Sequence, residues 1–342
     1  MMTSPPQELE TDSDMSARIQ DAEKKKSDVV VFVEDAITNG SGIGHSQRVA
    51  RAFGGKVVLV NVQCRLDHDD GPIDPVEWDI RKQQTLKWLN GLTRSVGDDG
   101  PPCEVKLLEG DCVNEIRNFM EHRQSDIAGA LRRHGDNGWS LSKTASGVLS
   151  SRSAGVLMIP QDASVEHGTT YKRILVPLDG STRAEIALPR AVVMALAEDA
   201  ELLLFYVSPN PGVTEFGVKD QDAERLHAQV RSRNRKAGKS YLAGIRNRLN
   251  REGLTISTKV CDDGDARRAL TDAISRENVD FVVMATHGQS GHRDVPTGDV
   301  ARYIMNRAAT PVLLIRHLNG SHSNHVFGKL SSEGVRQPVG TD

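Results

Sequence analysis

One stretch near the end of the chain, residues 280–316, limits the folds that this sequence can adopt. It opens with an apolar run, Phe281–Ala285, continues through a glycine-rich segment, takes on a helical pattern at Val300 and closes with a second apolar run, Val312–Ile315. Strand, loop, helix and strand in this order predict a βαβ unit. Backbone N–H groups of the loop and the positive end of the helix dipole then meet at one point, which favours an anion.

The glycines of this stretch have a distinctive spacing. Ala285-Thr-His-Gly288 is followed, after nine residues, by Gly298-Asp299-Val300. This spacing resembles the closing motif of universal stress protein domains, in which Gly, two residues, Gly, nine residues and Gly precede Ser or Thr. The resemblance implies glycines that let the backbone approach a triphosphate and a hydroxyl that donates to it. The sequence departs from the motif twice, with Ala285 in place of the first glycine and Asp299 in place of the hydroxyl residue.

Asp299 is the departure that matters more for a phosphate ligand. A carboxylate ~5 Å from a phosphate, at an effective dielectric of ~20, costs on the order of 3 kcal/mol per unit of phosphate charge before screening. That corresponds to roughly two decades in affinity. Two roles for Asp299 remain open. It can be the N-cap of the helix, satisfying the donors that would otherwise hold phosphate, or it can bind a divalent cation that bridges to phosphate.

The two halves of the chain repeat one another. In each half an apolar strand pattern ends in an acidic residue, and the distance from Glu34 to Val62 equals that from Asp179 to Val207. Strands that alternate with helices, and that are apolar almost throughout, predict parallel sheets covered by helices on both faces. The repeat and the resemblance together predict an α/β fold of two tandem, doubly wound, Rossmann-like domains with five-stranded sheets.

The resemblance covers nearly the whole chain outside its ends. The expected divisions are a disordered tail over 1–27 in which residues 15–25 can form some helix, a degenerate universal stress protein domain over 28–163, a second such domain with a candidate nucleotide pocket over 170–317, and a disordered tail over 318–342. The first domain is expected to be degenerate because its counterpart of the glycine-rich loop, residues 133–143, is about three residues shorter and lacks the second glycine. Family members often pair domains through their last strands, which are Val156–Ile159 and Val312–Ile315 here.

The candidate ligand site lies in the second half. Open α/β sheets bind ligands beyond the carboxyl ends of their strands, where the strand order reverses. The resemblance assigns residues next to adenosine, residues at the end of the fourth strand, and residues along the phosphates: Pro177, Leu178, Asp179 and Val207; Met284 and Ala285; and Gly288, Gly298, Asp299 and Val300. Asp179 can accept a hydrogen bond from a ribose hydroxyl or a base amine. Its sequence also fits a turn and helix cap, and one residue can do both.

Composition excludes several classes of partner. The net charge of -3 indicates no basic footprint, so no nucleic acid is expected as a partner. No apolar run approaches the ~20 residues that a membrane span needs. The four cysteines show no CxxC spacing, which predicts reduced thiols and a cytoplasmic protein. Residues 218–250 form the most basic segment, and a solvated face is expected there because the aromatic interleaving of nucleic-acid platforms is absent.

No catalytic or metal-ligating set emerges from the motifs. The chain has no GxxxxGK[ST] loop, no GxSxG elbow and no HExxH, and His287 and His292 lack a third convergent ligand. The leading hypothesis is therefore a stress-response protein that binds an adenine nucleotide, ATP or AMP, in its second domain without catalysis, or signals through it. Magnesium and a homodimer stay open. The alternatives are a slow ATP hydrolase and a nucleotide-free scaffold that acts through protein contacts.

Overall fold

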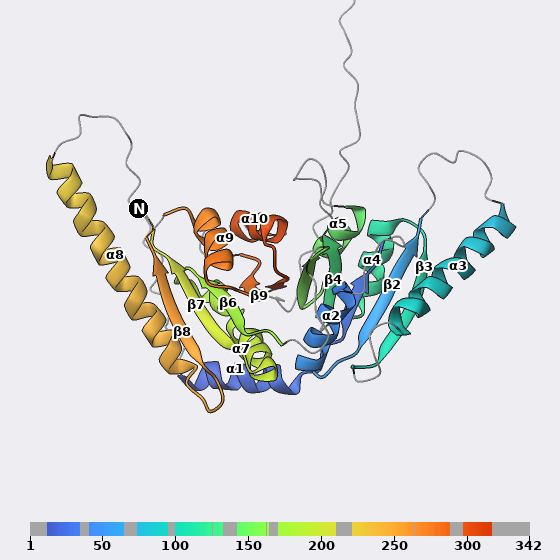
Figure 1. Ribbon diagram of the computed structural model, residues 1–342, viewed down its shortest axis with the longest axis horizontal. Coiled ribbons are helices and arrows are strands. Elements are labelled where there is room, and N and C mark those ends of the chain that lie inside the picture. The colour runs from blue at the N-terminus through green and yellow to red at the C-terminus, as the bar shows by residue number, and fades with distance from the viewer. Residues whose placement is uncertain are drawn as a thin grey trace, which may run out of the picture.

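The computed structural model of the chain describes residues 12–34, 41–64, 74–94, 100–124, 126–132, 142–161, 163, 170–209, 221–262, 264–287 and 297–316. Within these residues ten strands form one sheet in the order β3-β2-β1-β4-β5-β10-β9-β6-β7-β8 (Figure 1). The strands of the first half are β1 (Val29–Phe32), β2 (Val57–Gln63), β3 (Cys103–Glu109), β4 (Ile127–Arg132) and β5 (Gly155–Pro160). Those of the second half are β6 (Arg173–Leu178), β7 (Glu201–Val207), β8 (Ile256–Cys261), β9 (Phe281–Ala285) and β10 (Val312–Ile315).

All strand pairs within each half are parallel. The two halves join where β5 and β10 pair antiparallel, with Val312 opposite Met158 and Ile315 opposite Gly155. The strand order of the second half mirrors that of the first half across this join. In each half the strand order reverses beside the first strand, between β1 and β4 or between β6 and β9. The predicted α/β fold of two doubly wound parallel sheets is confirmed.

Helices cover both faces of the sheet. One face carries α1 (Asp12–Lys24), α2 (Ser41–Ala52), α3 (Pro75–Arg94), α6 (Thr182–Glu185), α7 (Leu188–Glu198) and α8 (Gln221–Arg248). The other carries α4 (Cys112–Glu121), α5 (Lys143–Ser150), α9 (Ala266–Arg276) and α10 (Asp299–Arg307). The strands serve both layers because successive side chains point to opposite faces. In β1, Val29 and Val31 enter one core, while Val30 and Phe32 enter the other.

The first helix departs from the disordered tail expected over 1–27. Residues 12–24 form α1, which lies across the second half of the molecule against α7 and α8 (Figure 1). Met15, Ile19 and Ala22 are spaced by four and three residues, so they share one helix face, and all three are buried. The segment is polar overall, so its apolar face is not obvious from the sequence. That face is buried only by contact with the second half. Residues 1–11 and 317–342 lie outside the described residues.

Polar contacts also cross between the halves. Arg48 of α2 forms an ion pair with Glu198 of α7 at 2.8 Å, and the backbone N–H of Tyr171 donates to the same carboxylate at 3.0 Å. His45 Nδ1 lies 2.6 Å from the Tyr171 hydroxyl, and Arg190 Nη2 donates to Ser27 Oγ at 2.9 Å. These side chains are largely buried, so the two halves share a polar junction beside their shared core. None of the described helices is long and apolar enough to cross a membrane.

Candidate functional site

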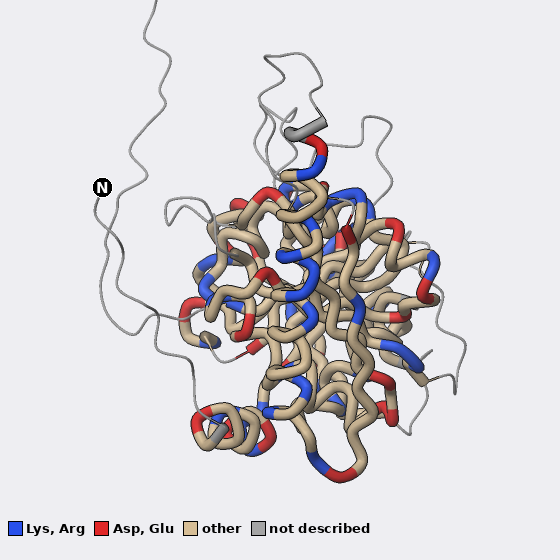
Figure 2. Tube along the Cα trace, turned by 90° about the vertical axis from the view of Figure 1, so that its left-hand side faces the viewer, with Lys and Arg blue, Asp and Glu red and all other residues tan. Residues whose placement is uncertain are grey.

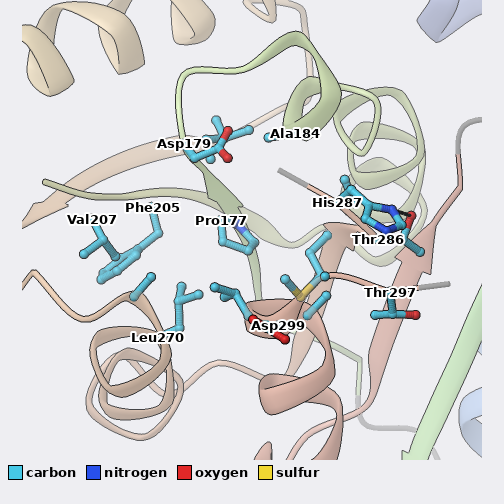
Figure 3. Close-up of a pocket in the computed structure, with 17 residues that line it drawn as sticks. Pro177, Asp179, Ala184, Phe205, Val207, Leu270, Thr286, His287, Thr297 and Asp299 are labelled. Atoms are coloured by element: carbon cyan, nitrogen blue, oxygen red, sulfur yellow. Dashed lines mark hydrogen bonds between the residues drawn. The ribbon is translucent and has the colours of Figure 1, made fainter. Parts of the chain in front are cut away.

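A pocket of about 280 Å³ opens beyond the carboxyl ends of β6, β7 and β9 (Figure 3). The N-terminal ends of α9 and α10 close its other side. β6 and β9 are the neighbours between which the strand order of this half reverses, so the pocket lies where open α/β sheets hold their ligands. Its described lining residues are Pro177, Leu178, Asp179, Ala184, Phe205, Val207, Ala266, Leu270, Met284, Ala285, Thr286, His287, Thr297, Gly298, Asp299, Val300 and Ala301.

The structure brings most of the sequence-predicted site residues together. All of them except Gly288 line this pocket, and they come from three strands and one helix. Gly288 lies outside the described residues. The first-half loop at 133–141, expected to have lost the cradle, lies outside them too.

Several lining residues were not predicted from the sequence. Phe205 stands two positions before Val207 on β7, and alternate residues of a strand share a face. Ala266 and Leu270 are four residues apart on α9, which places them on one side of that helix. Strand alternation and helix spacing could have identified these three residues, but only once the placement of α9 beside β7 and β9 was known.

The pocket has an apolar part and a polar part (Figure 3). Phe205, Val207 and Leu270 lie close together at one end of the close-up, while Thr286, His287 and Thr297 lie at the other. His287 Nδ1 is 3.2 Å from the Thr286 hydroxyl. Such a division suits a ligand with a flat apolar group at one end and hydrogen-bonding groups at the other.

Asp179 forms the turn that leads into α6. Its Oδ1 accepts from the Ser181 backbone N–H at 3.0 Å and from the Ser181 hydroxyl at 2.6 Å. Ser181, not Asp179, is the N-cap of α6, since its Oγ accepts from the Ala184 N–H at 3.1 Å. Gly180 makes the turn possible with a φ of 84°. Asp179 therefore orders the capping serine while its side chain borders the pocket.

Asp299 does not occupy the N-cap position of α10. The N-cap is Gly298, no side chain caps the helix, and Asp299 is the first helical residue. The Asp299 side chain is 86% exposed, and its nearest cation is Arg302 at 3.7 Å. The expectation that Asp299 caps the helix is therefore wrong, because an N-cap residue must precede the first helical turn to reach its N–H groups.

Gly298 holds the N-terminus of α10 close to the end of β9. Its N–H donates to the Thr286 carbonyl at 2.8 Å. A Cβ at this position would lie 3.2 Å from the same carbonyl oxygen, which is tighter than ordinary van der Waals contact. Glycine therefore favours the close approach, because a side chain here would push the Thr286 carbonyl away by a few tenths of an ångström. As the N-cap residue, Gly298 supplies no side-chain acceptor to the first N–H groups of α10 at the pocket wall.

A buried cluster behind the pocket fixes α6. Glu185 is 5% exposed and accepts from the Tyr241 hydroxyl and from Arg248 Nη2, each at 2.9 Å. Burial, followed by the nearby charge of Glu185, raises the pKa of Tyr241 well above its usual value. Burial and then Asp179 raise the pKa of Tyr206, which packs against Tyr241 with ring centroids 6.0 Å apart. Both tyrosines stay protonated at neutral pH, and Tyr241 donates its proton in the hydrogen bond to Glu185.

The pocket offers no evident metal centre. Among the residues that the structure describes, no group of three or more His, Cys, Asp or Glu side chains is placed to hold a metal ion. The described lining residues supply an apolar wall, hydroxyl groups and helix N–H donors.

Comparisons with known proteins bear on the second half and on the fold. Residues 170–316 match the model of the universal stress protein family. Universal stress protein MJ0531 of Methanocaldococcus jannaschii is 27% identical over 149 residues, 43% of this chain and 82% of that protein. Universal stress protein YxiE of Bacillus subtilis is 24% identical over 148 residues, 43% of this chain and 99% of that protein.

Solved structures extend the likeness over both halves. A universal stress protein from Archaeoglobus fulgidus has a TM-score of 0.55 at 18% identity, covering 85% of this chain and 97% of its own. Protein PA1789 of Pseudomonas aeruginosa has a TM-score of 0.51 at 15% identity, covering 87% of this chain and 94% of its own. At these identities the likeness concerns the fold alone. Residues 170–316 of this chain therefore form a domain of the universal stress protein family.

Proposed function

We propose that the second half binds an adenine nucleotide or nucleoside in the pocket beyond β6, β7 and β9, without catalysis, as the ligand-sensing part of a stress-response protein. The observation that carries the proposal is the pairing of an apolar wall with an open helix N-terminus in one pocket. Phe205, Val207 and Leu270 suit a purine base, and the N–H groups that follow Gly298 suit an anion. Asp179 borders the pocket and supplies a carboxylate to accept a hydrogen bond from a ribose hydroxyl in the proposed complex.

Asp299 decides which member of this ligand class is favoured. Asp299 is the first residue of α10, next to the N–H groups that the proposal assigns to phosphate, so its carboxylate opposes each added negative charge. AMP and adenosine are therefore favoured over ATP. Because the side chain is 86% exposed, water and salt screen the repulsion, so the penalty falls well below that of a buried pair.

The two repeats are proposed as separate domains over 28–163 and 170–317, of which only the second keeps the ligand site. The support for this division is the repeated strand order on the two sides of the β5–β10 pair. A magnesium ion bridging Asp299 to phosphate is the alternative that would make ATP the preferred ligand.

Calorimetric titration tests the proposal. The purified full chain, freed of co-purified nucleotide, is titrated with ATP, ADP, AMP and adenosine, with and without magnesium. We expect heat with AMP or adenosine, and none when Ala266→Leu fills the pocket from α9. Ala237→Leu, on the exposed side of α8, is the matched control and should bind as the wild type does.

Other outcomes select the alternatives. No heat with any of the four ligands would leave the nucleotide-free scaffold. Tight ATP binding only with magnesium would assign the bridging role to Asp299. ATP turnover that Ala266→Leu abolishes would replace the binding function with a slow hydrolase.

A further inference from the structure

The long helix α8 carries the most uneven charge in the molecule. From Arg225 to Arg251 the sequence contains nine Lys and Arg residues and no Asp or Glu, although the whole chain has a net charge of -3. Figure 2 shows these basic positions following one another along the helix on the side of the molecule that α8 forms. The expectation of no nucleic-acid partner was based on the net charge of the whole chain. That net charge combines this basic helix with acidic residues elsewhere in the chain.

Only some of these cations are neutralised. Arg235 pairs with Asp262 at 2.8 Å, Arg248 with Glu185 at 2.9 Å and Arg251 with Glu23 at 2.9 Å. Five exposed cations of α8 have no ion pair with any described residue. One is Arg231, and we call the other four the cationic stripe: Arg233, Lys236, Lys239 and Arg246. Their spacing of three, three and seven residues puts them along one side of α8. The opposite side, with Leu242, Ile245 and Leu249, is buried.

The stripe works against the stability of its own helix. Arg233 and Lys236, and Lys236 and Lys239, are like charges three residues apart, and Arg235 and Lys239 are four apart. Such pairs repel one another on a helix surface. In addition, no residue from Glu224 to Arg233 is fully buried, and this end of α8 extends past the sheet (Figure 1). An anionic partner would relieve the repulsion and support the projecting turns.

The residues around the stripe indicate the class of that partner. Between the cations of the stripe the exposed side chains are small, such as Ala237 and Ser240. The large apolar side chain that α8 exposes, Leu226, lies N-terminal to the stripe, so among the described residues the stripe itself has no apolar anchor for a protein interface. Along the stripe, the apolar face of α8 formed by Leu242, Ile245 and Leu249 is covered by the sheet, so it is not available to insert into a lipid surface. Tyr241 is engaged by Glu185 and Tyr206, so it offers no platform for an unpaired base.

A duplex nucleic acid matches these features. Its interfaces are polar and strongly positive, and its phosphates form a regular row of negative charge. The stripe runs for about 20 Å, taking ~1.5 Å per helical residue. We propose that the cationic stripe of α8 binds the phosphate backbone of a double-stranded nucleic acid without reading its base sequence. The proposal is independent of any ligand in the pocket.

The test is a fluorescence anisotropy titration of the full chain against a labelled duplex of roughly 20 base pairs, between about 50 and about 200 mM salt. We expect binding at low salt that weakens steeply as salt rises. The triple variant Arg233→Gln, Lys236→Gln, Lys239→Gln should lose at least ~tenfold in affinity, and its log–log salt slope should fall by about three. Since the variant removes repulsion, it should melt no lower than the wild type.

A matched control separates this surface from net charge alone. The triple variant Lys87→Gln, Lys106→Gln, Arg117→Gln removes the same charge from exposed residues of the first half that have no ion pair with described residues. It should bind within ~twofold of the wild type. Absence of duplex binding by the wild type at low salt, or equal losses in both triple variants, would overturn the proposal. Tighter binding to polyglutamate or to phosphatidylglycerol vesicles than to duplex would overturn it in favour of an acidic protein or a membrane surface.

Discussion

Asp299 stands where the family motif has Ser or Thr, at the first residue of α10 and at the edge of the pocket. From sequence, its carboxylate was expected either to cap the helix or to hold a cation. In the structure Gly298 is the N-cap of α10, and the Asp299 carboxylate is mostly exposed to solvent. Asp299 therefore neither fills the pocket nor caps α10, so its expected effect on the proposed ligand is through its charge.

The charge of Asp299 is expected to set the preference among phosphorylated ligands. Asp299→Ser should raise ATP affinity by about fivefold to tenfold, because a solvent-screened repulsion of roughly 1 kcal/mol is removed. Adenosine affinity should stay unchanged, since adenosine has no phosphate. Calorimetry with both ligands provides the measurement, and an equal change for ATP and adenosine would contradict the electrostatic role.

His45 is a second residue whose surroundings decide its chemistry. It is 4% exposed at the junction of the halves, with Nδ1 2.6 Å from the Tyr171 hydroxyl. Burial, with a further contribution from the positive charge of Arg48, lowers its pKa to about 4. The folded state therefore holds His45 neutral at pH values where the unfolded chain, with a pKa near 6.5, already binds a proton.

Acid should therefore weaken the fold through His45. Stability from this residue is complete above about pH 6.5 and is lost as the pH falls towards 4, because only the unfolded chain takes up the proton over that range. Between pH 7 and pH 5 the loss should be about 2 kcal/mol. Denaturant unfolding of the wild type and of His45→Gln at both pH values measures it. Identical pH dependence in the two proteins would show that His45 does not titrate in this way.

At the scale of elements, the ends of α5 and α10 are held by arginines from the opposite halves. Arg132 of β4 donates to the carbonyls of Met305 at 3.0 Å and Ala308 at 2.6 Å, at the C-terminus of α10. Arg316, after β10, donates to the carbonyls of Leu149 and Ser151 at the C-terminus of α5. Burial lowers the pKa of Arg316 to about 10, which leaves it charged at neutral pH. A cation at a helix C-terminus is favourable.

The two arginines offer a matched pair of variants. Arg132→Ala and Arg316→Ala should each lower the free energy of unfolding by roughly 1–3 kcal/mol, because buried carbonyls lose a charged donor. Only Arg132→Ala should also weaken ligand binding, since α10 forms the pocket wall and α5 does not. Unfolding curves and calorimetry are compared for both. Equal weakening of the ligand in both variants would show a general loss of stability instead.

Helix α1 makes its apolar contacts with the half to which it does not belong in sequence. Ile19→Asp should place a carboxylate in that contact, at a cost of about 3 kcal/mol or more, and release α1 from α7. Limited proteolysis near residue 20 and denaturant unfolding report the release. The exposed neighbour variant Gln20→Asp should change stability by less than ~0.5 kcal/mol, and a similar loss in both would argue against docking through Ile19.

At the scale of the whole molecule, one sheet and shared cores link the two halves. One core cluster contains Leu157 and Ile159 of the first half together with Ile174 and Leu313 of the second. The β5–β10 pair continues the sheet between them. Neither half can lose its core without exposing apolar surface on the other, which favours cooperative unfolding.

The tryptophans make this cooperativity measurable. Trp78, Trp88 and Trp139 all belong to the first half of the sequence, so tryptophan fluorescence reports on that half, whereas far-UV circular dichroism reports on both. The two denaturation midpoints should coincide in the full chain. A fluorescence transition that is complete before the circular dichroism transition begins would show that the halves unfold separately.

Local patterns in the sequence were sufficient for the architecture, whereas the residues expected at the candidate site came from the family resemblance. The apolar runs of β9 and β10, the repeat between the halves and the spacing of Gly288 and Gly298 depend on neighbouring residues, and neighbouring residues are what strand alternation and loop length constrain. The same reasoning placed Asp179 and Val207 at strand ends, which lie together in any parallel sheet of this order.

The tertiary structure alone decided the contacts that join distant segments. Local spacing does not reveal that Arg132 reaches α10, that α1 docks on α7, or that Leu270 faces Phe205 across the pocket. Local spacing also did not show whether Gly298 or Asp299 is the N-cap of α10. If the helix start shifts by one residue, the N-cap residue and the first helical residue change places. Secondary structure follows from residues close in sequence, whereas docking, burial and the surroundings of a charge depend on segments that meet only after the chain has folded.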